Sequence, residues 1–129
     1  MTASDTTSSD NPALGPLVLI QHPPYQGHRA RAGVDCALSF AVFSLAPVLV
    51  FVGDGVLCLT ESAAAADGRK SLRKLIDSLP LYDIETVFVE EQALRRFSLD
   101  TDQLPVFARV LSATDLHVQL NTAPSVLSY

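Results

Sequence analysis

Short, largely apolar runs alternate with helix-like segments along the sequence, and this alternation restricts the fold more than any other feature. The runs are residues 17–20, 48–52, 85–89, 105–111 and 126–129. A strand that is apolar at consecutive positions is typical of a sheet covered on both faces. The pattern therefore predicts an α/β fold, with a three-layer α/β/α arrangement around a mostly parallel sheet of about five strands.

Segments with helical spacing of apolar residues fill the intervals between these runs. They are residues 28–44, 71–79, 90–97 and 112–121. Ser112 is the expected N-cap of the last helix, because a serine hydroxyl accepts a hydrogen bond from the first helical turn. Residues 61–68 are rich in alanine and are predicted to be irregular.

The first predicted helix is apolar around most of its circumference. One face carries Ala30, Val34, Ala37, Leu38 and Ala41, and another carries Gly33, Cys36, Phe40 and Phe43. A surface helix usually has one apolar stripe, so two stripes indicate burial on two sides. We expect the first face to pack on the sheet. The second face, with Cys36, Phe40 and Phe43 as interface candidates, is expected to contact a partner subunit.

Length and composition bound the class of protein. The 129 residues suffice for one domain, predicted over residues 17–129, after a flexible polar tail over residues 1–16. No basic and apolar leader and no apolar run of about 20 residues occurs, so we expect a cytoplasmic protein that does not enter a membrane. The formal net charge of −5 argues against direct nucleic-acid binding, which needs a basic surface.

The turn after the second apolar run is the first candidate for a binding site. Ligands of open α/β sheets bind beyond the carboxyl ends of the strands, and Gly53, Asp54 and Gly55 follow residues 48–52 directly. Backbone N–H groups in such a turn can bind an anion or a nucleotide. No GxGxxG or P-loop pattern accompanies the turn, however. A tight turn with glycine at positive φ is the other interpretation.

Two cysteines and three histidines are the remaining candidates for chemistry. Cys36 lies among apolar helix residues, which favours a buried, unreactive thiol. Cys58 lies between two leucines, which favours core packing over a reactive thiol. We expect His22 in a loop and His117 on a helix surface. With His28, they lack a recognised metal-ligand spacing, so neither a metal nor a cofactor is expected.

Basic side chains are few but grouped. The groups are Arg29 with Arg31, then Arg69, Lys70, Arg73 and Lys74, then Arg95 with Arg96. Solvated helix ends explain such groups in general. Charge pairing with acidic surfaces of partner subunits is the alternative.

Three segments carry a family signature. They are Gly33-Val34-Asp35-Cys36-Ala37-Leu38, Val50-Phe51-Val52-Gly53-Asp54-Gly55-Val56 and Leu81-Tyr82-Asp83-Ile84-Glu85. They resemble the TusC/DsrF branch of the DsrE-like sulfur-relay proteins, from about Leu17 to Tyr129. Ala93-Leu94-Arg95-Arg96 resembles the segment after the third strand in the wider DsrE-like group. The resemblance implies a DsrE-like α/β/α subunit of a TusBCD- or DsrEFH-type heterohexamer.

The resemblance also implies partners and a process. The partners would be TusB/DsrH-like and TusD/DsrE-like subunits, with an indirect link to a TusE/DsrC-like sulfur acceptor. Complexes of this kind pass persulfide sulfur towards 2-thiolation of the tRNA wobble uridine, or they serve sulfur oxidation. The sequence does not distinguish these two processes.

The position of the relay cysteine distinguishes the subunits of this group. In TusD/DsrE-type subunits that cysteine follows the third strand, where this chain has Val89 and Glu90. A carboxylate cannot carry transferable sulfur, so the resemblance implies a non-catalytic subunit that is not an enzyme alone. The alternatives are a sulfur carrier that uses Cys58 and a small anion- or nucleotide-binding module at the turn from Gly53 to Gly55.

Overall fold

Five parallel strands form one sheet in the order β5-β4-β3-β2-β6. The computed structural model describes residues 15–24, 27–60 and 72–129. The strands are β2 (Leu17–Ile20), β3 (Val48–Phe51), β4 (Val87–Glu90), β5 (Ala108–Leu111) and β6 (Val126–Ser128). Apolar side chains on both faces of β2 and β3 are buried, as their uninterrupted apolar sequences require. The predicted fold class is confirmed.

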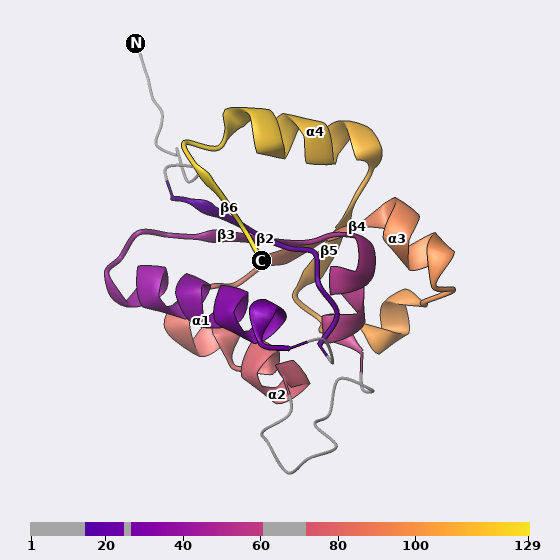
Figure 1. The fold of residues 1–129 in the computed structure, drawn as a ribbon, viewed down its shortest axis with the longest axis horizontal. Helices are drawn as coiled ribbons and strands as arrows, with labels where there is room; N and C mark the ends of the chain where they lie inside the picture. The colour runs from indigo at the N-terminus through magenta and orange to yellow at the C-terminus, as the bar shows by residue number, and fades with distance from the viewer. Residues whose placement is uncertain (1–14, 25–26, 61–71) are drawn as a thin grey trace.

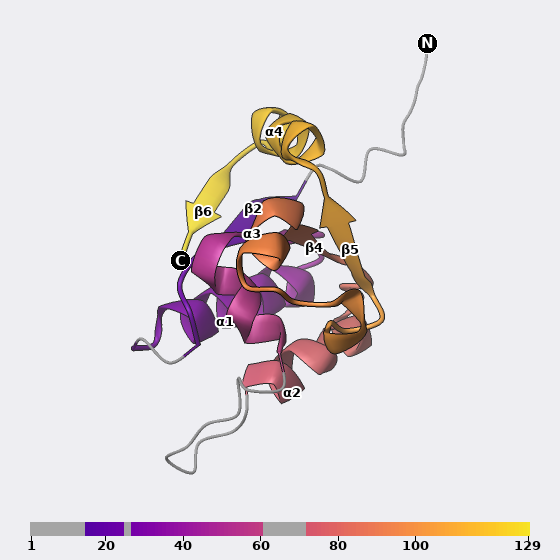
Figure 2. The same cartoon turned by 90° about the vertical axis from the view of Figure 1, so that its right-hand side faces the viewer.

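Helices connect the strands and form the outer layers. In chain order they are α1 (Arg29–Val42), the 3₁₀ helix η2 (Gly53–Leu59), α2 (Leu72–Asp77), η4 (Leu79–Tyr82), α3 (Glu91–Arg96), η5 (Thr101–Gln103) and α4 (Ala113–Thr122). Figure 1 shows α1 and α2 on one face of the sheet and α4 on the other. Figure 2 looks at the edge where β2, β3 and β4 end, and there α3 lies in front of the sheet.

The buried face of α1 differs from the predicted one, since Leu38 and Ala41 are only partly buried. Ala30, Val34 and Ala37 are buried as expected, but Gly33 is buried with them instead of lying on the second face. A Cβ atom at Gly33 would collide with the Ile20 side chain and lie 2.9 Å from Cβ of Tyr129. Because glycine has no side chain, α1 can lie close to β2 and to the residue after β6 at this point.

Element boundaries differ from the predicted ones where local hydrogen bonds compete with the apolar pattern. The strand predicted to begin at residue 105 begins at Ala108, because the Ala108 N–H donates to the Pro105 carbonyl in a tight turn. The helix predicted to reach residue 44 ends at Val42, and Ser44 has a φ of 60°. Ser112 is confirmed as N-cap, since its side chain accepts from the Asp115 N–H.

Some predictions concern residues that the structure does not describe. The Ala-rich segment over residues 61–68 lies outside the described residues, as do Arg69 and Lys70. The predicted tail over residues 1–16 also lies outside them, except for Gly15 and Pro16. These statements stay predictions.

Gly55 packs where η2 folds back over the end of β2. The Ile20 carbonyl accepts a hydrogen bond from the Val52 N–H at 2.9 Å, and a Cβ atom at Gly55 would overlap this carbonyl. Gly53, by contrast, has a φ of +53°, and a Cβ atom there would meet nothing within 4 Å. Gly55 is therefore required for space and Gly53 for backbone conformation.

We expect Gly55→Ala to lower the free energy of unfolding more than Gly53→Ala does. A left-handed alanine costs roughly 1–2 kcal/mol. Overlap with the Ile20 carbonyl forces η2 away from β2, and because the contact is with backbone we expect a cost at the upper end of the roughly 1–3 kcal/mol typical of overpacking. Urea unfolding of both variants measures the difference. Equal losses would show that η2 can shift without cost.

Candidate functional site

The carboxyl ends of β2, β3 and β4 bring together the loop with His22, the start of η2, and Glu90. Glu90 is the last residue of β4, and its Oε1 atom accepts a hydrogen bond from the Gly53 N–H at 2.9 Å. The positive φ of Gly53 is confirmed at +53°. A chain segment 37 residues away thus supplies a carboxylate to the glycine turn.

Ion pairs around this edge connect α3 with η2. Arg96 lies 3.6 Å from Asp54, and its guanidinium also lies over the Phe97 ring, 4.9 Å from the centroid. Within α3, Arg95 pairs with Glu91 at 3.5 Å. Exposed pairs of this kind contribute little to stability. They do show that Arg95 and Arg96 have acidic partners inside the chain.

The glycine turn is already occupied by the chain's own carboxylate. An anion site in such a turn depends on free backbone N–H groups, but the Gly53 N–H is bonded to Glu90, and the Gly55 N–H donates to the Val52 carbonyl at 2.9 Å. The side chain of Asp54 adds a second negative charge beside it. This arrangement disfavours the interpretation of the turn as an anion- or nucleotide-binding module.

Cys58 lies on η2 and is buried in the hydrophobic core, as expected for core packing. Its exposed fraction is 0%, and its thiol donates to the His22 carbonyl at 3.6 Å. Burial raises the pKa of the Cys58 thiol from 9.0 to about 12. Since the thiolate is the nucleophile in sulfur chemistry, Cys58 is poorly suited to accept a persulfide.

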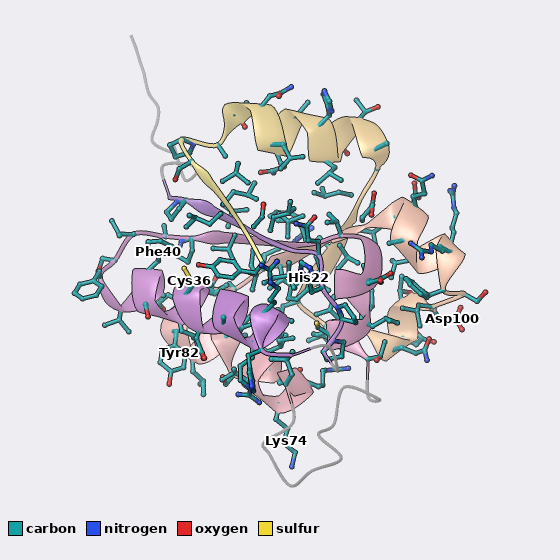
Figure 3. The ribbon with its side chains drawn as sticks, in the orientation of Figure 1. His22, Cys36, Phe40, Lys74, Tyr82 and Asp100 are labelled. Atoms are coloured by element: carbon teal, nitrogen blue, oxygen red, sulfur yellow. The ribbon has the colours of Figure 1, made fainter. Side chains whose placement is uncertain are left out.

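His22 lies in the loop after β2, as expected, and its labelled side chain appears near the end of β6 in Figure 3. Its Nδ1 atom is buried and has no hydrogen-bond partner within the described part of the chain. His22 meets Cys58 through its backbone, not its ring. Because the two residues are 36 positions apart, no local sequence pattern indicates this contact.

Cys36 is partly exposed on α1, in contrast to the buried thiol that the apolar neighbours predict. The cause is the position of α1 at the outer layer, where only the side with Ala30, Gly33 and Val34 faces the sheet. The pKa of the Tyr129 hydroxyl is raised, mainly by a hydrogen bond with Cys36. The sequence did not indicate this contact, because it joins residues 36 and 129.

The two phenylalanines of the predicted interface face differ. Phe40 is partly buried and packs against the hydrophobic core, whereas Phe43 is 75% exposed. Figure 3 shows Phe40 on the sheet side of α1. Phe43 therefore remains an interface candidate, and Phe40 contributes to the fold of the chain itself.

Arg73 has a role that its grouping with other basic residues did not indicate. Its guanidinium donates to the carbonyls of Leu59 at 2.6 Å and Gln103 at 3.0 Å, and it pairs with Asp77 at 3.0 Å. These bonds hold the end of η2 beside η5 and α2. Arg73 is thus neither a solvated helix end nor a free charge for a partner.

Among the residues that the structure describes, histidines and carboxylates do not gather into a metal site. Within residues 15–24, 27–60 and 72–129, no three His, Cys, Asp or Glu side chains are grouped as metal ligands would be. His117 is exposed on α4, as expected, far in sequence from both cysteines. No helix in the described ranges has the length and apolar character needed to cross a bilayer.

Comparison with known proteins first identifies the family of this chain. The fold is similar to the ychN protein from Escherichia coli, with a TM-score of 0.75 over 89% of this chain and 99% of that chain at 14% identity, which supports the fold alone. The profile of the DsrE/DsrF-like family matches residues 17–129. The chain belongs to the DsrE/DsrF-like family.

Curated relatives narrow the assignment within the family. A protein named TusC homolog from Vibrio vulnificus strain CMCP6 is 30% identical over 112 residues, which are 86% of this chain and 95% of the relative. Another TusC homolog, from Pseudomonas aeruginosa, is 26% identical over 113 residues, with 87% and 95% covered. The resemblance to the TusC branch is thus confirmed.

We expect the two thiols to react very differently. At pH 8 a thiol-specific reagent should modify Cys36 in the native chain, while Cys58 reacts only after unfolding, because its pKa of about 12 leaves almost no thiolate. The protonated Cys58 thiol favours the fold below pH 9, and this contribution is lost as the pH rises towards 12. Peptide mass spectrometry after alkylation identifies the modified residue. Rapid native labelling of Cys58 would contradict the buried position.

The bond between Glu90 and Gly53 should contribute measurably to stability. Glu90→Ala leaves the Gly53 N–H without its acceptor, so the free energy of unfolding should fall by about 1–3 kcal/mol. Glu90→Gln keeps an acceptor oxygen and should lose less. Hydrogen exchange at the Gly53 amide should accelerate in Glu90→Ala alone. Equal exchange in both variants would show that the carboxylate does not hold the turn.

Proposed function

We propose that this chain is a non-catalytic subunit of a sulfur-relay complex of the TusBCD or DsrEFH type. Membership of the DsrE/DsrF-like family and the curated TusC homologues support the assignment to such a complex. In this proposal the chain supports transfer of persulfide sulfur by its partners and does not carry the sulfur.

The observation on which the non-catalytic role rests is the end of β4. The relay position implied by the resemblance holds Val89, which is fully buried, and Glu90, whose carboxylate is bonded to Gly53. Persulfide transfer needs a sulfur nucleophile. A carboxylate anchored to the backbone supplies none.

The carrier alternative depends on Cys58 and is disfavoured by its surroundings. A carrier thiol must reach a donor and an acceptor on other proteins, but Cys58 is fully buried and its pKa is raised to about 12. The anion-binding alternative is disfavoured because Glu90 occupies the Gly53 N–H. Both arguments favour a supporting role.

The proposed partners are TusB/DsrH-like and TusD/DsrE-like subunits in a heterohexamer, with an indirect link to a TusE/DsrC-like acceptor. Exposed Phe43 at the end of α1 supports contact with other subunits. The acidic balance of the chain, with a formal net charge of −5, supports action through these proteins and not through direct contact with tRNA. A cytoplasmic location is part of the proposal.

Reconstitution tests the proposal. The chain is co-expressed with the TusB/DsrH-like and TusD/DsrE-like proteins of its own genome, and light scattering after gel filtration measures the mass of the assembly. Sulfur transfer to the TusE/DsrC-like acceptor is then followed with and without the chain. Absence of a joint assembly would overturn the proposal. In cells lacking the gene, the 2-thiouridine content of tRNA distinguishes thiolation from sulfur oxidation.

Removing the cysteines should not stop sulfur transfer. We expect Cys36→Ala, Cys58→Ala and the double variant to support transfer by the reconstituted complex at close to the wild-type rate, because neither thiol occupies the relay position. Cys58→Ala is expected to lower stability, since it leaves a small cavity in the core. Lost transfer in an intact assembly would contradict the non-catalytic role.

A further inference from the structure

Exposed apolar side chains gather where β3 and β4 begin, opposite the edge with Glu90. We call the following residues the strand-start patch: Val42, Phe43, Leu45, Leu81 and Tyr82. The first three connect α1 to β3, and the last two belong to η4, which precedes β4. β3 and β4 are adjacent and parallel, and α1 contacts η4, so both segments lie at one edge of the sheet. Figure 1 shows η4 behind the C-terminal half of α1.

These side chains do not serve the chain's own core. Leu81 is 84% exposed and Phe43 75% exposed, although Leu79, two residues before Leu81, is fully buried. Figure 3 shows Tyr82 pointing away from the sheet below α1. The backbone around the patch is held by left-handed residues, with φ of 60° at Ser44 and 67° at Asp83. A cluster of exposed apolar side chains is typical of a protein-protein contact.

Two acidic residues lie beside the patch. Asp83 and Glu85 follow Tyr82 closely in the chain and are exposed. Neither carboxylate forms an ion pair or hydrogen bond within the described part of the chain, unlike Asp54 and Asp77, which pair with Arg96 and Arg73. These two carboxylates therefore leave a negative potential at the margin of an apolar surface.

The carboxylates of Asp83 and Glu85 restrict which protein surface can bind the strand-start patch. A two-fold symmetric dimer through the patch would bring Asp83 and Glu85 of both copies into one interface. The patch itself contains no basic side chain to pair with them, and unpaired like charges at an interface are unfavourable. A different chain with apolar side chains in the centre and Lys or Arg at the margin complements both features. We propose that the strand-start patch binds such a partner subunit, apolar with a basic margin. This inference rests on the proposed function, because it assigns the contact surface of that complex.

Variants of the full chain in the co-expressed complex test the surface. Leu81→Ser and Phe43→Ser remove apolar contact area, and Glu85→Lys reverses the charge. Val118→Ser, on α4 at the other face of the sheet, is the matched control because Val118 is 56% exposed. We expect each patch variant to weaken binding about tenfold or more, and the control to change it less than about twofold. The Glu85→Lys effect should shrink at high salt.

Direct coupling identifies the chemistry of the partner. A zero-length carbodiimide joins a carboxylate to a lysine in contact with it. We expect mass spectrometry to find Asp83 or Glu85 joined to a lysine of the TusB/DsrH-like or TusD/DsrE-like chain. Circular dichroism of the variants should match the wild type, since the substituted side chains are exposed.

The outcomes separate the two proposals. If the wild type assembles and all patch variants bind as well as the control does, the patch proposal is overturned while the proposed function stands. If the wild type does not assemble with these chains, both are overturned. If the isolated chain forms dimers or longer oligomers that Leu81→Ser abolishes, the occupant is a second copy, and a basic partner is excluded.

Discussion

Parallel pairing of three apolar strands, β2, β3 and β4, is the constraint on which the rest of this structure depends. Parallel strands place all their carboxyl ends at one edge and all their starts at the opposite edge. Their apolar sequences require cover on both faces, which α1 with α2 and α4 provide. Segments far apart in the chain, such as Gly53 and Glu90, meet for this reason alone.

The two edges of the sheet have opposite character. At the carboxyl edge, the charged groups of the glycine turn have partners within the chain: Glu90 binds Gly53, and Asp54 pairs with Arg96. At the starting edge, apolar side chains such as Leu81 remain exposed beside the carboxylates of Asp83 and Glu85. Ligands of open α/β sheets bind at the carboxyl edge. Here the Gly53 turn at that edge is occupied by the chain's own Glu90, and the opposite edge presents the features of an interface.

Helix α1 shows which buried side chains helical periodicity predicts and which it does not. The spacing of Ala30, Val34 and Ala37 correctly predicted the face that packs on the sheet. It did not separate Phe40, which touches the core, from Phe43, which is exposed. A residue at the margin of a helix face is buried or exposed according to what lies beside the helix, and helical spacing contains no information about that neighbour.

The sequence by itself determined the fold class, the order of strands and helices along the chain, and the absence of a cysteine at the end of β4. A strand that is apolar at consecutive positions must be covered on both faces of its sheet, which requires a layer of helices on each side. The absence of a residue type can be read from the sequence directly. Tertiary structure alone decided that the Glu90 carboxylate accepts a hydrogen bond from the Gly53 N–H. It also decided that Cys58 is buried, with its thiol donating to the His22 carbonyl. These contacts join residues 36 and 37 positions apart, and no local pattern determines which loop ends meet across a sheet.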